Sequence, residues 1–152
     1  MPNNGHNATI NGGGFHHVAI RVYDFDSSMK FYMEGLGFTH RYGWGEDGRG
    51  KGEKDSRGVL LDTGDGNYLE VFGGSTRKPA DSPPDLVMFH FAIRTTDVDA
   101  ALERARAAGG VVTVEPKDVV PPNAEAPVQT FRIAFVNGPD GESVEFFHND
   151  TL

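Results

Sequence analysis

Two histidines and two glutamates occur at matching places in the two halves of the sequence. His17 begins HVAIRVYDFD and His90 begins HFAIRTTDVD, while Glu70 and Glu145 fall within DGNYLEVF and DGESVEFF. The chain contains no Cys, so thiol nucleophiles and thiolate ligands are excluded, and any metal site depends on imidazole and carboxylate groups. Such nitrogen and oxygen ligands suit Ni, Zn, Co, Mn or Fe(II), with solvent at the open positions.

The matching segments recur in the same order and at nearly the same separation. Residues 17–26 and 90–99 are offset by 73 positions, and residues 65–72 and 140–147 by 75. Two such matches indicate a duplicated module of about 75 residues.

The composition between the repeats indicates where one module ends and the next begins. Residues 73–86 are rich in Gly, Pro and Ser and are predicted to link module 1, residues 15–72, to module 2, residues 87–148. Residues 1–14 have no basic cluster and no apolar run, so they are predicted to form a disordered tail.

A strand at the start of each module is expected to position the candidate residues. Residues 15–23 alternate in polarity, which predicts a strand with His17 and Arg21 on one face and Val18 on the other. On this pattern His16 points to the apolar face, as a core or edge histidine. Further strands are expected near residues 38–43, 58–63, 67–72, 111–114, 130–136 and 142–148.

The same alternation applies to the other candidate residues. His90 and Arg94 share one face of a second strand, and Glu70 and Glu145 each lie opposite aliphatic neighbours. A single His–Glu pair is also typical of a solvated sheet face. Because the duplication preserves both pairs, we expect two modules related by a pseudo-twofold, within one chain or across a dimer, to bring all four groups into one metal-binding cavity.

An amphipathic helix is expected after the first strand of each module. The first has its N-cap at Asp24 or Asp26, and the second at Asp97 or Asp99. Apolar side chains at helical spacing follow each cap: Met29, Tyr32, Met33 and Leu36 in the first helix, and Val98, Ala101, Leu102 and Ala105 in the second. Strand, helix and further strands in each half predict an α+β fold.

The overall charge disfavours polyanionic partners. Asp and Glu number 22 against 14 Lys and Arg, which gives a net charge of −8 with neutral His. This is the wrong sign for nucleic acid or anionic membrane surfaces, and no stretch approaches the ~18 apolar residues of a membrane span. We expect a cytoplasmic protein that binds a small-molecule substrate, with no nucleic-acid or membrane partner.

These residues resemble the vicinal oxygen chelate superfamily, which includes glyoxalase I, bleomycin-resistance proteins and extradiol dioxygenases. FHHVAIRVYDFDSSMKFYMEGLGF resembles its first strand and helix, and FRIAFVNGPDGESVEFF its closing hairpin. The resemblance covers residues 15–148 and implies one domain of two tandem βαβββ modules, whose curled mixed sheets surround a central metal. It further implies a homodimer and one divalent metal ion per site, held by His17, Glu70, His90 and Glu145.

Within the superfamily, Glu70 is similar to the second ligand of bacterial glyoxalase I, or lactoylglutathione lyase. That resemblance implies a lyase or isomerase in which proton transfer passes through a metal-stabilised enediolate, with a glutathione hemithioacetal as substrate. Glu145 is then the preferred catalytic base, and Glu70 takes the proton on the opposite face. Arg21 matches the arginine for the glutathione carboxylate, but Gly74 stands where an Asn is usual, so the thiol cosubstrate stays open.

Other candidate substrate-binding residues are Arg94, Tyr68, Phe72 and Trp44. Trp44 falls in residues 43–58, which are polar and glycine-rich and are not expected to pack. They are expected to form either a mobile loop over the site or a plain surface loop. Two other functions fit the sequence. One is another enzyme of the superfamily, an acyl-CoA epimerase or a dioxygenase, and the other is a metal-free protein that sequesters an antibiotic such as bleomycin.

Overall fold

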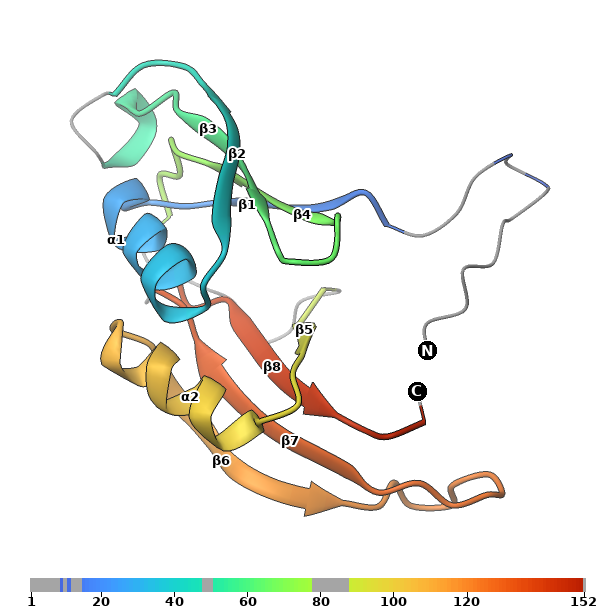
Figure 1. Ribbon diagram of the computed structural model, residues 1–152. Coiled ribbons are helices and arrows are strands. Elements are labelled where there is room, and N and C mark those ends of the chain that lie inside the picture. The colour runs from blue at the N-terminus through green and yellow to red at the C-terminus, as the bar shows by residue number, and fades with distance from the viewer. Residues whose placement is uncertain (1–8, 10, 12–14, 48–50, 78–87, 152) are drawn as a thin grey trace.

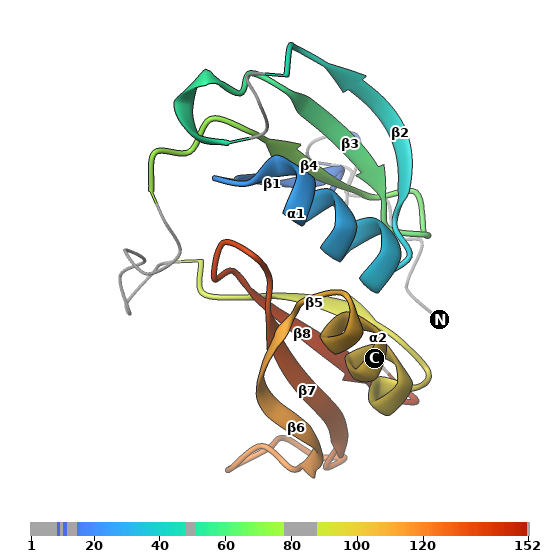
Figure 2. The same ribbon diagram turned by 90° about the vertical axis from the view of Figure 1, so that its left-hand side faces the viewer.

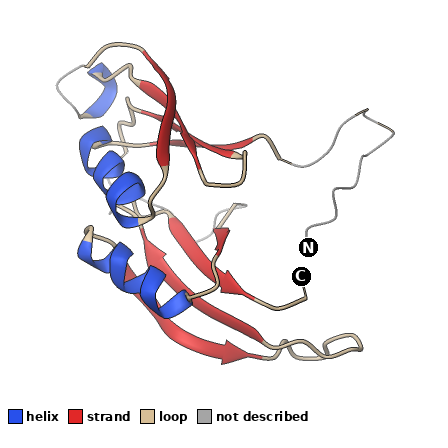
Figure 3. Ribbon diagram, in the orientation of Figure 1, coloured by secondary structure: helices blue, strands red, loops and turns tan. Residues whose placement is uncertain are grey.

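The structure is a computed structural model that describes residues 9, 11, 15–47, 51–77 and 88–151. Within these ranges the chain forms two similar halves, each with a four-stranded sheet and a helix (Figures 1 and 3). The first half comprises β1 (His17–Arg21), α1 (Phe25–Met29), the π-helical turn η1 (Lys30–Gly35), β2 (Thr39–Trp44), the 3-10 turn η2 (Gly52–Lys54), β3 (Gly58–Asp62) and β4 (Tyr68–Phe72). The second half comprises β5 (Phe91–Arg94), α2 (Val98–Ala107), β6 (Val111–Val119), β7 (Phe131–Asn137) and β8 (Ser143–His148).

The two sheets have the same topology, which confirms the predicted α+β fold of two βαβββ modules. Their strand orders are β1-β4-β3-β2 and β5-β8-β7-β6. The first strand of each sheet runs parallel to its neighbour, and the other pairings are antiparallel. Most of the predicted tail, residues 1–14, and of the predicted linker, residues 73–86, lies outside the described residues. No helix in the described ranges is long and apolar enough to cross a lipid bilayer.

Matching aspartates begin the main helix of each module. The Asp24 carboxylate accepts a hydrogen bond from the Ser27 N–H at 3.0 Å, and Asp97 accepts one from the Ala100 N–H at 3.0 Å. These bonds satisfy backbone donors that have no partner within the helix. The first aspartate of each predicted alternative is therefore the N-cap, at the same distance from its strand in both modules.

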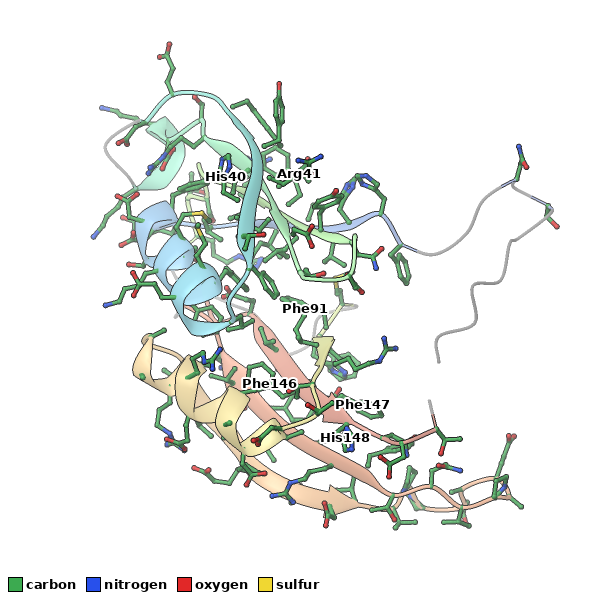
Figure 4. The ribbon with its side chains drawn as sticks, viewed as in Figure 1. His40, Arg41, Phe91, Phe146, Phe147 and His148 are labelled. Carbon is green, nitrogen blue, oxygen red and sulfur yellow. The ribbon has the colours of Figure 1, made fainter. Side chains whose placement is uncertain are left out.

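The strands β1 and β4 alternate as the sequence predicts. On β1, His17 and Arg21 are exposed, while Val18 packs against the core. On β8, Phe146 is buried in the core, and its neighbour Phe147 instead contacts the Phe131 ring, at a centroid distance of 5.1 Å (Figure 4). Each sheet therefore has one apolar face against its helix and one face that carries the polar candidates.

The first helix differs from the predicted amphipathic pattern. After Met29 the chain widens into η1, where the Leu36 N–H donates to the Phe31 carbonyl, five residues earlier, at 3.2 Å. This wider turn changes which side chains share a face. Phe31 and Tyr32 are both fully buried, whereas Met33, which was expected in the core, is exposed.

The modules meet through their helices, which lie side by side in Figures 1 and 2. Gly35 of η1 lies so close to α2 that a Cβ there would stand 2.8 Å from the Ala108 Cβ. The buried apolar residues of both modules form one continuous cluster, which includes Phe31 and Leu102. The helices therefore lie between the modules, and the two sheets do not close around a common centre within the described part of the chain.

The polar segment between β2 and β3 is anchored, which corrects the expectation that residues 43–58 do not pack. Arg57 lies over the Phe25 ring at 4.3 Å and donates to the carboxylates of Asp55 and Asp26, each at 2.9 Å. Asp55 is only 2% exposed. Burial by itself raises the pKa of the Asp55 carboxyl, but hydrogen bonds and the charge from Arg57 outweigh it and hold that pKa below its ordinary value.

Candidate functional site

In module 1, His17 and Glu70 form a pair on the polar face of the sheet. His17 begins β1, and Glu70 lies on the neighbouring strand β4, in register with Ala19. The His17 Nε2 and Glu70 Oε2 atoms are 3.3 Å apart. Parallel pairing thus places the imidazole and the carboxylate diagonally across two adjacent strands.

Module 2 repeats this arrangement. Glu145 lies on β8 in register with Ala92, and the His90 side chain comes from the residue before β5. The His90 Nε2 and Glu145 Oε2 atoms are 3.2 Å apart. Glu145 is 9% exposed, and this burial raises the pKa of its carboxyl above the ordinary value, while the charge and hydrogen bond of His90 act in the opposite direction.

The two pairs do not come together within the chain. Among the described residues, no group of three or more His, Asp or Glu side chains is placed to hold one metal ion. The four candidates therefore form no common site within the described part of one chain, and of the two arrangements that the repeat allows, one chain or a dimer, the dimer remains. The physical reason is that the modules pack helix against helix, which keeps the polar faces of the two sheets apart.

Each pair nevertheless fits half of a metal site. An imidazole nitrogen and a carboxylate oxygen face each other, and both are ligands for divalent cations of the Ni, Zn, Co, Mn and Fe(II) group. The Nδ1 atom of His90 is buried without a hydrogen-bond partner in the described part of the chain, so this ring is held by packing. A complete set of four ligands needs both kinds of pair.

Three of the predicted substrate-binding residues lie together beside the first pair. The Arg21 guanidinium lies over the Phe72 ring at 5.5 Å and donates to the Gly73 carbonyl at 3.3 Å. The Trp44 ring meets Phe72 at a centroid distance of 5.6 Å. The sheet thus presents a cation and two aromatic rings on the face that carries Glu70.

The remaining two candidates, Tyr68 and Arg94, line a cavity of about 530 Å³ between the modules. His17 lines it as well, so the cavity reaches one member of the first pair. Arg94 is exposed on β5, and the Tyr68 ring contacts the His16 ring in a tilted arrangement, with ring centroids 5.1 Å apart. The two predicted arginines thus have different surroundings: Arg21 of β1 lies beside Phe72, and Arg94 of β5 lines the cavity.

Sequence reasoning missed the position of His16. The strand begins only at His17, so alternation does not extend to His16, which is exposed rather than on the apolar face. Its Nδ1 atom lies 2.9 Å from the Nδ1 atom of His17. The two adjacent histidines in FHH were the feature of the sequence that could have indicated this contact.

The turn PDGE also has a role that its sequence did not indicate. The Asp140 carboxylate accepts a hydrogen bond from the Tyr23 N–H at 2.7 Å, and Glu142 accepts one from the Tyr32 hydroxyl at 2.7 Å. Both bonds join module 2 to module 1. Burial raises the pKa of Glu142 to about 7.

The chain belongs to the Glyoxalase/Bleomycin resistance protein/Dioxygenase superfamily, whose family model matches residues 14–146. It is 30% identical over 144 residues to a probable lactoylglutathione lyase of Vibrio cholerae, covering 88% of each chain. It is also 30% identical over 146 residues to the 2-epi-5-epi-valiolone epimerase of an Actinomyces species, covering 88% of this chain and 78% of that one. The solved glyoxalase family protein of Enterococcus faecalis has a similar fold, with a TM-score of 0.64, 21% identity, and coverage of 89% of this chain and 97% of that one.

Proposed function

We propose that the protein is a divalent-metal-dependent lyase or isomerase of the glyoxalase I type. The observation that carries this proposal is the repetition of one His–Glu pair, at 3.3 Å and 3.2 Å, at equivalent positions of both modules. A solvated sheet face has no reason to keep both partners at this distance twice. The 30% identity to a probable lactoylglutathione lyase supports the same activity.

The four paired residues, His17, Glu70, His90 and Glu145, would hold one metal ion. When bound, a divalent cation polarises a substrate carbonyl and stabilises the negative charge that develops on its oxygen. Glu145 is the proposed base, and burial raises the pKa of its carboxyl above the ordinary value, which makes the ionised form a stronger proton acceptor.

The residues of the chain have separate tasks in this proposal. Glu145 removes a proton from the carbon next to the substrate carbonyl and returns it to the neighbouring carbon. Arg21 binds a substrate carboxylate, because its guanidinium is exposed on the face that carries Glu70. Phe72 and Trp44 cover the apolar part of the substrate.

We further propose that the functional unit is a homodimer. Each module contributes two ligands, and a second copy would supply the pair that a single chain leaves apart. Large apolar side chains near both pairs are exposed, among them Phe15 (84%), Met88 (64%) and Phe89 (69%). Exposed apolar side chains grouped in this way are typical of a surface that another subunit covers.

Metal content is the first test. Purified protein, analysed by mass spectrometry, is expected to hold one divalent ion per proposed site, and Glu70→Gln and His90→Ala are each expected to lower occupancy. The exposed Glu34→Gln is a matched control that should leave occupancy unchanged. Full occupancy in both site variants would contradict the ligand assignment, and a metal-free wild type would favour the antibiotic-binding alternative.

Turnover is the second test. The metal-loaded protein is expected to convert the hemithioacetal of methylglyoxal and glutathione, and Glu145→Gln should be about 10²–10⁴-fold slower at equal metal occupancy, because a general base is lost. Near-normal turnover of that variant would move the base role to Glu70. Inactivity of the metal-loaded wild type would contradict the glyoxalase I assignment and leave family membership intact.

An epimerase is the second candidate function. The 30% identity to 2-epi-5-epi-valiolone epimerase favours it, as does Gly74 in place of a glutathione-binding Asn. Epimerisation also begins with removal of a proton from the carbon next to a carbonyl, but a proton then returns to the same carbon from the opposite face. In that case Glu145 would remove the proton and Glu70 would deliver one on the other face. Parallel assays with the hemithioacetal and with 2-epi-5-epi-valiolone distinguish the two activities.

A further inference from the structure

We propose that His16 is a positioning residue for His17. In this proposal the His16 imidazole is the hydrogen-bond partner of the His17 Nδ1 atom, and it thereby keeps the His17 Nε2 atom directed at Glu70 and the metal. The metal part of this inference rests on the proposed function, whereas the contact between the two histidines is a property of the chain itself.

Two contacts place the His17 ring between His16 and Glu70. The Nδ1 atoms of His16 and His17 are 2.9 Å apart, which is hydrogen-bond distance. The opposite ring nitrogen of His17, Nε2, lies 3.3 Å from Glu70 Oε2. Both nitrogens of the proposed ligand are therefore engaged, and the plane of the ring is fixed.

His16 is itself held in place by β4. Its carbonyl accepts a hydrogen bond from the Tyr68 N–H at 2.9 Å, and its ring contacts the Tyr68 ring at a centroid distance of 5.1 Å and a tilt of 49°. The rings of His16 and His17 meet edge to face, with an interplanar angle of 86°. Because both the backbone and the ring of His16 are held by Tyr68, His16 can orient the neighbouring His17 ring.

Module 2 provides a natural comparison. Phe89 occupies the position that corresponds to His16, and its ring meets the His90 ring edge to face at 4.5 Å. Phenylalanine offers no hydrogen-bond acceptor, and the His90 Nδ1 atom is buried without a partner in the described part of the chain. The duplicated modules thus differ at this contact, and among the described residues module 1 alone gives the Nδ1 atom of its histidine a polar partner.

The chemical reason lies in the tautomer of the ligand. An imidazole binds a metal through Nε2 only when that nitrogen carries a lone pair, so the remaining proton resides on Nδ1 and needs an acceptor. The neutral His16 ring can accept a hydrogen bond from the His17 Nδ1–H at its own Nδ1. In the metal-free chain the His16 Nδ1–H can instead donate to the His17 Nδ1 atom. The contact therefore persists in both tautomers.

Two substitutions test the proposal. His16→Phe copies the residue of module 2 and removes the partner, whereas His16→Asn retains an acceptor oxygen close to the position of Nδ1. The zinc dissociation constant, measured by competition with a chromophoric chelator at about pH 8.5, where free imidazole is neutral, is the readout. We expect about 10–100-fold weaker binding for His16→Phe and a value within about threefold of wild type for His16→Asn.

His40→Phe is the matched control, because it makes the same change at an exposed histidine of β2 that belongs to neither His–Glu pair, and its zinc affinity should equal that of wild type. Unchanged affinity in His16→Phe, or equally weak binding in His16→Asn, would overturn the proposal.

A second readout needs no metal. Long-range ¹H–¹⁵N correlation spectra of the metal-free protein report the His17 Nδ1 resonance directly. It should move in His16→Phe, while the resonances of His90 stay in place. If the wild type binds no metal, the proposed function fails but this spectrum still decides the role of His16, because an unchanged His17 resonance would overturn it.

Discussion

Glu142 and Glu145 are three residues apart, and the structure gives their carboxylates different surroundings. Glu145 faces His90, a potential metal ligand, at 3.2 Å. Glu142 instead accepts hydrogen bonds from the Tyr32 hydroxyl at 2.7 Å and the Asp140 N–H at 2.8 Å, in the contact between the modules. Both carboxyls have raised pKa values because of burial, but only Glu145 lies where that shift can serve proton transfer.

The Glu142 carboxyl predicts a defined pH dependence of stability. Burial raises its pKa in the fold from 4.5 to about 7, so its contribution is fully present below pH 4.5 and is lost as the pH rises through about 7. The loss is on the order of 3 kcal/mol. Urea unfolding between pH 5 and 8 should show that Glu142→Gln gains stability relative to wild type as the pH rises, since the amide stays neutral.

Glu34→Gln, an exposed change on η1, is the control for this comparison and should give a pH profile parallel to that of wild type. If the stability of Glu142→Gln also changed with pH in parallel to wild type, the pKa of the Glu142 carboxyl would not be raised in the fold.

At the scale of elements, the contact between η1 and α2 depends on small residues. Gly35 faces Ala108 and the backbone of Ala105, and a Cβ at Gly35 would stand 2.8 Å from the Ala108 Cβ. Real Cβ atoms do not approach this closely, so a larger residue would push the two elements apart. Because these helices join the modules, their spacing also sets how the two sheets are placed.

Gly35→Ala is expected to destabilise the protein. Alanine favours a helix over glycine by about 1 kcal/mol, but crowding a packed contact typically costs about 1–3 kcal/mol, so we expect a net loss. Urea unfolding measures it. The double variant Gly35→Ala/Ala108→Gly removes the opposing methyl group and should recover most of the stability. A more stable single variant would contradict the close approach of η1 and α2.

At the scale of the whole molecule, the separated His–Glu pairs predict sites that form between chains. In the proposed homodimer, module 1 of one chain would face module 2 of its partner. His17→Ala and His90→Ala chains would then each lack a complete site in their own dimers, whereas a mixed dimer would contain one intact site and one without either histidine.

A mixing experiment measures this directly. Equal amounts of the two variants, unfolded together and refolded, should recover about a quarter of wild-type metal binding, because half of the dimers are mixed and one of their two sites is intact. Each variant refolded alone is the control. No recovery, or a monomer in sedimentation at micromolar concentration, would contradict a site shared between chains.

The sequence by itself determined the local features of each module. Alternation on β1 set His17 against Val18, and the aspartates at Asp24 and Asp97 marked where the helices begin. The internal repeat then predicted two equivalent His–Glu pairs. These features depend on backbone geometry and on neighbours a few residues apart, which a sequence pattern records directly.

Only the tertiary structure decided how the modules meet and what lies beside each candidate. The π-helical turn buries Phe31 and exposes Met33, and Arg57 anchors a segment whose composition suggested a loose loop. Within the described part of the chain the two His–Glu pairs form no common site, because the modules pack through their helices, where Gly35 approaches Ala108 closely and apolar residues of both modules share one core. Such packing depends on side chains distant in sequence fitting together, and no local periodicity encodes that fit.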